Sequence, residues 1–138
     1  MDAAQALADL TEISSQIQAA VLFRADGSVI SSTLEDDART QQLAEGARAL
    51  LSAADEASAD QGPLVQLEAA TPEGSVFVLR GSELVVAATT TPEPTVGLVF
   101  YDLKSCLRNV AQEEEKPKRK RAAPRKKKTE GEGEGDAA

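Results

Sequence analysis

The sequence predicts an α+β fold in which a single five-stranded antiparallel sheet is flanked by helices. Apolar patterns of helical and strand type follow one another in the order helix, strand, strand, helix, strand, strand, strand, helix. The links between successive strands are short: Asp26-Gly27, residues 72–74 and residues 81–83. Links of that length force antiparallel pairing, and a sandwich of helices against one sheet is the simplest packing of this order.

The first 33 residues predict a helix followed by a β-hairpin. Apolar side chains recur at helical spacing at Ala3, Ala6, Leu7, Leu10 and Ile13. With Asp2 as the N-cap, this spacing predicts a helix over about residues 2–15. Residues 17–23 form an almost continuous apolar run, which is typical of a central strand covered on both faces. Asp26-Gly27 supplies the positive φ angles of a tight turn, and residues 28–33 return as the partner strand.

A long central helix is predicted from Asp36 or Asp37 to about Asp60, and Gly62-Pro63 ends it. Two adjoining apolar ridges run along this helix: Leu43, Ala47, Leu50, Ala54 and Ala57 form one, and Ala44, Leu51 and Ser58 form the other. The stripe is wider than packing on one sheet requires. One edge can cover the sheet while the other meets a second helix, for example that of a second copy of the chain. The alternative is a monomer whose central helix is simply rich in alanine.

Three strands and a last helix are predicted in the second half of the chain. The strands span residues 64–71, 75–80 and 84–90. Thr95 can then cap a helix. One apolar face of this helix would comprise Val96, Val99, Phe100, Leu103, Leu107 and Val110. A strand through "VGLVFY" is the competing interpretation, but the helical spacing continues beyond that segment and favours the helix.

The composition narrows the available chemistry. The chain has 138 residues, enough for one domain and a tail, with no histidine and with Cys106 as its only cysteine. This composition rules out internal disulfides, most metal sites and any Ser-His or Cys-His nucleophile. The glycine and lysine spacing of a nucleotide-binding P-loop is also missing. We therefore expect no enzymatic activity, no catalytic residues, no metal and no cofactor.

The compartment is inferred from the amino-terminal residues and the lone thiol. The segment "MDAAQALADL" lacks the basic start of a signal peptide, and no apolar stretch approaches the length that spans a bilayer. A single cysteine fits a reducing environment. We expect a cytoplasmic protein, and the alanine-rich composition is typical of bacteria with a high genomic GC content.

Three groups of residues have both a structural and a functional interpretation. Glu35, Asp36 and Asp37 suit a helix N-terminus, although a carboxylate pair can also bind a cation or act as acid and base. Cys106 suits packing in the last helix more than reactivity, since no histidine can activate it. The arginines of the body are solvated charges or arginine fingers for a partner's active site: Arg24, Arg39, Arg48, Arg80 and Arg108.

Three segments carry a family resemblance: "IQAAVLFRADGSVISS", "GSVFVLRGSELVVAATT" and "TVGLVFYDLKSCLRNV". In this order they resemble the roadblock family of dynein light chains, in particular its bacterial MglB-like branch, over about residues 3–111. The resemblance implies a roadblock/profilin-like sandwich and a non-enzymatic platform that holds small Ras-like GTPases or motor components. The bacterial branch stimulates GTP hydrolysis by such a GTPase without donating an arginine finger.

The resemblance also implies a homodimer or heterodimer in which the central helices pair and the third strands join two sheets into one. Such pairing would explain the wide apolar stripe of the central helix. The dimer-interface residues expected on this basis are Leu43, Ala47, Leu50, Leu51, Ala54, Leu64 and Leu67.

A basic tail follows the domain. Residues 1–112 carry six basic and sixteen acidic groups, a net charge of −10, whereas residues 113–138 carry nine basic and seven acidic groups, a net charge of +2. The nine cations are Lys116, Lys118, Arg119, Lys120, Arg121, Arg125, Lys126, Lys127 and Lys128. With almost no apolar residue, the tail is predicted to be disordered from residue 113. It is suited to bind DNA or RNA, anionic lipid or an acidic protein surface, or to act only as a solubilising segment.

Two functional hypotheses follow. The first is a dimeric regulator or adaptor for a small Ras-like GTPase, with the basic tail as an electrostatic tether. The second is a nucleic-acid-associated protein in which the acidic body dimerises two basic tails. The sequence identifies neither the partner GTPase nor the ligand of the tail.

Overall fold

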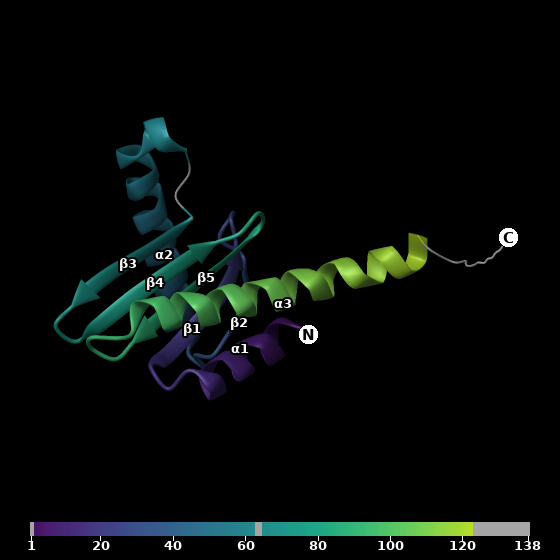
Figure 1. Cartoon of the computed structure of the whole chain (residues 1–138), viewed down its shortest axis with the longest axis horizontal. Coiled ribbons are helices and arrows are strands. Elements are labelled where there is room, and N and C mark those ends of the chain that lie inside the picture. Colours follow the sequence, from purple (N-terminus) through teal and green to yellow (C-terminus); the bar gives the residue numbers. More distant parts are fainter. Residues whose placement is uncertain (1, 63–64, 123–138) are drawn as a thin grey trace, which may run out of the picture.

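The predicted order of helices and strands is confirmed by the computed structural model, which describes residues 2–62 and 65–122 (Figure 1). The elements are α1 (Ala3–Ile13), β1 (Ile17–Arg24), β2 (Val29–Ser32), α2 (Asp37–Ala57), a 3-10 turn η1 (Ala59–Gln61), β3 (Gln66–Thr71), β4 (Gly74–Arg80), β5 (Leu84–Thr90) and α3 (Val96–Ala122). The five strands form one sheet in the order β2-β1-β5-β4-β3, and every neighbouring pair is antiparallel.

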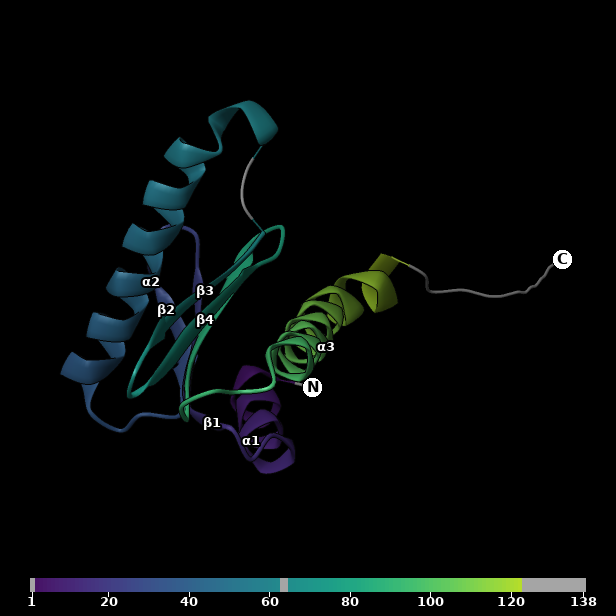
Figure 2. The ribbon, with the colours of Figure 1, turned by 60° about the vertical axis from the view of Figure 1, so that its left-hand side comes forward.

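The helices cover the two faces of the sheet unequally. Figure 2 shows α1 and α3 on one face and α2 alone on the other. Between α1, α3 and the sheet lies the larger core, in which the Phe77 and Phe100 rings meet edge to face at a centroid distance of 5.0 Å. The smaller core lies under α2 and includes Val21 and Phe23 of β1. Because alternate residues of β1 enter opposite cores, this strand is buried on both faces, as its apolar run predicts.

The hairpin between β1 and β2 differs in detail from the predicted turn. Of the two turn residues only Gly27 has a positive φ, at 97°. The link is a three-residue loop, because the Gly27 amide donates to the Arg24 carbonyl at 2.8 Å and the Arg24 amide donates to the Ser28 carbonyl at 2.9 Å. The Ser28 amide and hydroxyl also donate to the Asp26 carboxylate and lower its pKa. Asp26 therefore acts through its side chain, whereas Gly27 supplies the positive φ angle that the turn needs.

The helix starts follow the predicted caps. The Asp2 carboxylate accepts a hydrogen bond from the Gln5 amide at 2.8 Å, and the Asp36 carboxylate accepts one from the Ala38 amide at 2.9 Å. The segment "VGLVFY" is helical, because Val99 and Phe100 share a buried face of α3 with residues further along the helix. In the part of the chain that the structure describes, no helix is both long and apolar enough to cross a membrane.

The helix α3 is longer than predicted. It runs to Ala122, so residues 113–122, which we predicted to be disordered, have helical backbone. Apart from Pro117, this segment consists of Glu, Lys, Arg and Ala, and these residue types have high helix propensity, which the compositional prediction of disorder did not weigh. The rest of the predicted tail, residues 123–138, lies outside the described residues, as does the predicted start of β3 at Leu64.

Two glycines provide a matched test of this fold. At Gly74, at the start of β4, φ is 154° and a Cβ atom would collide with the backbone carbonyl of Thr90. Gly97, in the first turn of α3, has open space around the same position. We expect Gly74→Ala to lower the free energy of unfolding by about 1–3 kcal/mol, measured in urea. Gly97→Ala should leave it unchanged or raise it slightly; equal effects of the two substitutions would contradict the β4–β5 geometry.

Candidate functional site: the outer face of α2 and the edge of the sheet

The helix α2 has one edge in the core and one edge toward solvent. Its buried edge, formed by Thr40, Ala44, Ala47 and Leu51, packs on the sheet. On its other side Leu43 is half-buried, Gly46 is exposed and Leu50 is 36% exposed. We call these three residues the outer face of α2. This burial pattern shows that one edge of the predicted apolar stripe packs on the sheet and that the chain itself leaves the second edge uncovered.

A groove opens between the outer face of α2 and the sheet. Because α2 packs mainly on β1, β2 and β5, it leaves Val76 of β4 and Leu67 of β3 only half-buried on this face, although Val78 of β4 is fully buried. The resulting cavity, which we call the α2–sheet groove, has a volume of about 430 Å³. Its apolar walls include Leu34, Leu43, Leu50 and Val76, and Arg39 also lines it. It is an apolar surface with little charge.

Gly46 lies in the middle of α2, within this groove. A glycine inside a helix costs roughly 0.5–1 kcal/mol relative to alanine. No atom lies within 4 Å of the position that a Cβ atom would occupy, so alanine would fit in the single chain. Packing within one chain therefore gives no reason for the glycine, whereas close approach of another backbone would.

The strand β3 forms one edge of the sheet. It pairs only with β4 among the described strands, so its other side presents backbone amides and carbonyls without a strand partner. Leu67 of β3 lies opposite Val78 of β4, and both belong to the core on the α2 side. The free edge and the α2–sheet groove are thus on the same side of the molecule.

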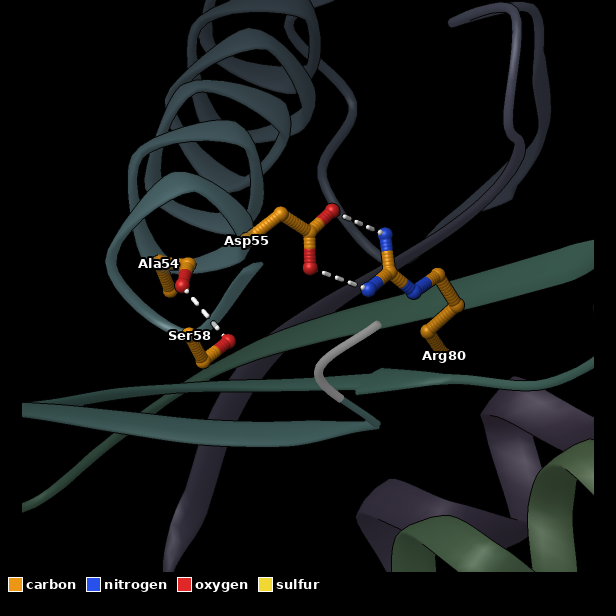
Figure 3. Close-up of polar contacts among 4 residues, drawn as sticks. All are labelled: Ala54, Asp55, Ser58 and Arg80. Carbon is orange, nitrogen blue, oxygen red and sulfur yellow. Dashed lines mark hydrogen bonds and ion pairs between the residues drawn. The ribbon is translucent and has the colours of Figure 1, made fainter. Parts of the chain in front are cut away.

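An ion pair fixes the C-terminal half of α2 over the sheet. The Arg80 guanidinium of β4 donates two hydrogen bonds to the Asp55 carboxylate of α2, with N–O distances of 3.0 and 2.7 Å (Figure 3). This bidentate contact raises the pKa of Arg80. Figure 3 also shows the last turn of α2, where the Ser58 hydroxyl donates to the Ala54 carbonyl. Arg80 is thereby held by its own chain, which argues against a role as an arginine finger.

The predicted dimer-interface residues fall into three groups. Leu50 is exposed, and Leu43, Ala54 and Leu67 are half-buried, so all four are accessible to a partner. Ala47 and Leu51 are 1% and 5% exposed and fill the chain's own core, so within the single chain they are not accessible to a partner. Helical spacing identifies a stripe but does not say which edge meets the sheet. Leu64 lies outside the described residues.

The remaining candidates are placed as follows. Arg24 is half-buried, and Arg39, Arg48 and Arg108 are exposed. Glu35, Asp36 and Asp37 are exposed at the start of α2, where Asp36 is the N-cap. Among the described residues no group of three or more potential ligands is arranged to hold a metal ion. Asp36 thus has the capping role that suits a helix N-terminus.

The structure adds residues that the sequence analysis did not single out for function. Val76 and Leu34 line the α2–sheet groove, and Gly46 opens it. The sheet residues could not be found from sequence, because their exposure depends on which strands α2 leaves uncovered. Gly46 did carry a signal, since an isolated glycine within a helical pattern often has a packing reason. Arg80 and Asp55 are 25 residues apart in the sequence, and no local sequence pattern indicated that they would pair.

Comparison with solved structures identifies the fold. No protein-family model matches the sequence, and no curated protein matches it closely enough to be called a relative. The roadblock/LC7 domain from Streptomyces avermitilis is similar with a TM-score of 0.74 and 22% identity, over 81% of this chain and 97% of that chain. Myxococcus xanthus MglB gives 0.71 and 17%, over 83% and 95%. Acanthamoeba castellanii profilin IA gives 0.53 and 13%, over 78% and 96%. The chain has the roadblock/LC7 fold, as its segments predict.

Cys106 provides a pH test of the core between α1 and α3. It is 4% exposed, and burial, followed by the charge of Asp9, raises the pKa of its thiol from the usual 9.0 to about 11. The unfolded thiol thus ionises first. Its contribution to stability is complete below pH 9 and is lost as the pH rises from 9 to 11.

We therefore expect the free energy of unfolding to fall more steeply between pH 8 and pH 10.5 in the native sequence than in Cys106→Ala, with both measured in urea. Comparing the two proteins cancels the titration of tyrosine and lysine. Parallel curves would contradict the buried position of the thiol. Slow reaction of the folded protein with a thiol reagent at pH 8 is the accompanying expectation.

Proposed function

We propose that this chain is a homodimer formed through the outer face of α2 and the edge of β3, and that the dimer is a regulatory or adaptor platform for a small Ras-like GTPase. The roadblock/LC7 fold and its likeness to MglB support a role of this class. The α2–sheet groove beside a free strand edge is the observation on which the proposal mainly rests. The platform role is a regulatory one, with no reaction carried out by the chain itself.

A second copy would satisfy both features at once. In a two-fold arrangement the same patch faces itself, so Leu43 and Leu50 of one protomer would meet the equivalent helix of its partner. Antiparallel pairing of β3 with its copy would satisfy the backbone groups of the edge and extend the sheet. Gly46 would lie where the two helices approach most closely. The Arg80–Asp55 pair would hold each helix in place for this contact.

The first prediction concerns a charge in the proposed interface. Leu50→Glu would bury a carboxylate between two helices, which costs several kcal/mol if it stays unpaired, so we expect at least a 100-fold weaker dimer. The matched control is Ile13→Glu, since Ile13 is a 73% exposed apolar residue of α1, away from α2. Light scattering after size-exclusion chromatography should give twice the 14.5 kDa chain mass for the native protein and the control. A native monomer at micromolar concentration would contradict the proposal.

The second prediction uses Gly46 to separate folding from pairing. Gly46→Ala should stabilise the single chain by about 0.5–1 kcal/mol, because it improves helix propensity and meets no atom. Gly46→Leu should also keep the far-ultraviolet circular dichroism of the native protein, but should prevent close approach of two helices. Loss of the dimer in Gly46→Leu with an intact fold is the expected result. An unchanged dimer in Gly46→Leu would show that Gly46 does not lie in the interface.

The GTPase role needs a separate test. Each small Ras-like GTPase encoded in the source genome would be purified, loaded with GDP or a non-hydrolysable GTP analogue, and titrated against the native protein and against Leu50→Glu. We expect one GTPase to bind the native protein with a preference for one nucleotide state, and to bind the monomeric variant more weakly. Failure of every GTPase to bind in both states would overturn this role and leave the dimer unaffected.

A further inference from the structure

A second groove opens between α1 and α3, the two helices that Figure 2 shows on the face of the sheet opposite α2. We call it the α1–α3 groove. Ala6, Leu10 and Cys106 line it and are all buried, so they form its floor. Its volume is about 180 Å³, below the roughly 300–1,000 Å³ that is usual for small-molecule pockets. The groove is therefore matched to side chains of a larger partner rather than to a free small ligand.

Two strongly exposed apolar side chains also line this groove. Ile13 at the end of α1 is 73% exposed and Tyr101 of α3 is 67% exposed, the two highest values among the large apolar residues that the structure describes. Leu98, one turn before Tyr101 on the same face of α3, is exposed as well. Single exposed apolar residues are ordinary, but a group of them beside a groove marks an interaction surface.

The charged residues of the groove are acidic. Asp9 of α1 and Asp102 of α3 line it and are half-buried, and the charge of Asp9 reaches the floor, where it helps to raise the pKa of Cys106. Among the described residues that line the groove there is no lysine or arginine. Lys104 and Arg108 of α3 line a different cavity, near β3 and β4. The α1–α3 groove thus combines apolar walls with two negative charges and no positive one.

Hydrogen bonds fix the two walls of the groove relative to each other. Gln16, just after α1, accepts hydrogen bonds from both ends of the loop that leads into α3. The Thr91 amide donates to the Gln16 backbone carbonyl at 3.0 Å, and the Thr95 amide donates to the Gln16 side-chain oxygen. The end of α1 is thereby held beside the start of α3. A groove that is formed before binding avoids the cost of ordering its walls when a partner arrives.

We propose that the α1–α3 groove binds a basic amphipathic helix of another protein, with large apolar side chains against Ile13 and Tyr101 and lysines or arginines beside Asp9 and Asp102. An amphipathic helix that lies in a groove buries its apolar face, and half-buried charges are screened less by salt than exposed ones. The helix α1 contacts β1 and β2, at the other edge of the sheet from β3. The site therefore stays accessible in the proposed dimer and does not depend on the GTPase role.

The character of the groove argues against three other occupants. Residues 116–128 of this chain are basic but contain no large apolar residue, so they would leave the apolar walls uncovered. An anionic lipid surface would be repelled by the two carboxylates. A second copy in a two-fold arrangement would bring the same carboxylates toward each other, and facing like charges oppose binding. A partner that carries both apolar and basic side chains satisfies the whole groove.

The binding experiment uses the full chain and three fluorescent 18-residue peptides, with anisotropy measured at 150 mM NaCl. The first peptide has leucines on one helical face and lysines on the other. The second has glutamine in place of leucine, and the third has glutamate in place of lysine. We expect the leucine–lysine peptide to bind at least tenfold more tightly than either of the others. Equal binding of the first and second peptides would show that the acidic domain attracts cations without using the groove, and would overturn the proposal.

Two carboxylate variants with the same net charge locate the attraction. Asp9→Asn/Asp102→Asn should weaken binding of the leucine–lysine peptide at least fivefold. The control Glu73→Gln/Glu83→Gln removes two exposed carboxylates from the turns between β3, β4 and β5 and should change binding less than twofold. Equal effects of the two variants would mean that only the total charge of the domain matters, which would overturn the site.

The apolar walls are tested by Ile13→Ser/Tyr101→Ser, which should weaken the same peptide at least tenfold while leaving the far-ultraviolet circular dichroism unchanged, because both side chains are exposed. Cys106, the only cysteine, reports whether the groove is filled. A saturating amount of peptide should slow its modification by N-ethylmaleimide at pH 8 at least threefold in the native protein. An unchanged rate at saturation, or unchanged affinity of the serine variant, would place the peptide elsewhere and overturn the groove.

Light scattering tests a second copy as the occupant. We expect the same mass for the native protein and for Ile13→Ser/Tyr101→Ser. A native mass above twice the 14.5 kDa chain mass that falls in this variant would identify a second copy in the groove and would overturn the assignment to another protein.

Discussion

The burial of β1 on both faces is the constraint on which the rest of the structure depends. Val21 and Phe23 enter the core under α2, while Ala20 and Leu22 enter the core under α1 and α3. A strand of this kind cannot belong to a sheet that is covered on one face only, because the open face would leave apolar side chains in water. The sheet must therefore be covered on both faces at β1, which also pairs on both of its edges, with β2 and β5.

The two faces of the sheet are covered to different extents by helices, and the candidate site results from this difference. Two helices cover one face from β2 to β4, whereas a single helix covers the other and lies mainly over β1, β2 and β5. Val76 of β4 and Thr89 of β5 then line a groove whose opposite wall is α2 itself. The apolar surface of this groove arises from the same residue pattern that builds the core, extended past the area that one helix can shield.

Local patterns were sufficient to predict most of the fold from the sequence. The carboxylates of Asp2 and Asp36 mark their helix starts by a mechanism that acts within three residues, and the doubly buried β1 follows from its unbroken apolar run. Ala47 and Leu51, which we expected at the dimer interface, lie in the chain's own core, because two ridges of one helix look equivalent until the sheet beneath them is known. The Arg80–Asp55 pair and the groove depend on contacts between distant segments, which a single sequence does not record.

The continuity of α3 has a mechanical consequence. Val99, Leu103 and Val110 hold its proximal half against the sheet, and the same unbroken helix continues to Ala122. A helix resists bending because each turn is hydrogen-bonded to the next, and α3 crosses the domain boundary without a break; further along, Pro117 has no amide hydrogen and removes one of these bonds. The part of α3 between Val110 and Pro117 is therefore a stiff lever: a load on it is transmitted as torque to the packed side chains of the core, where a hinged tail would have absorbed it.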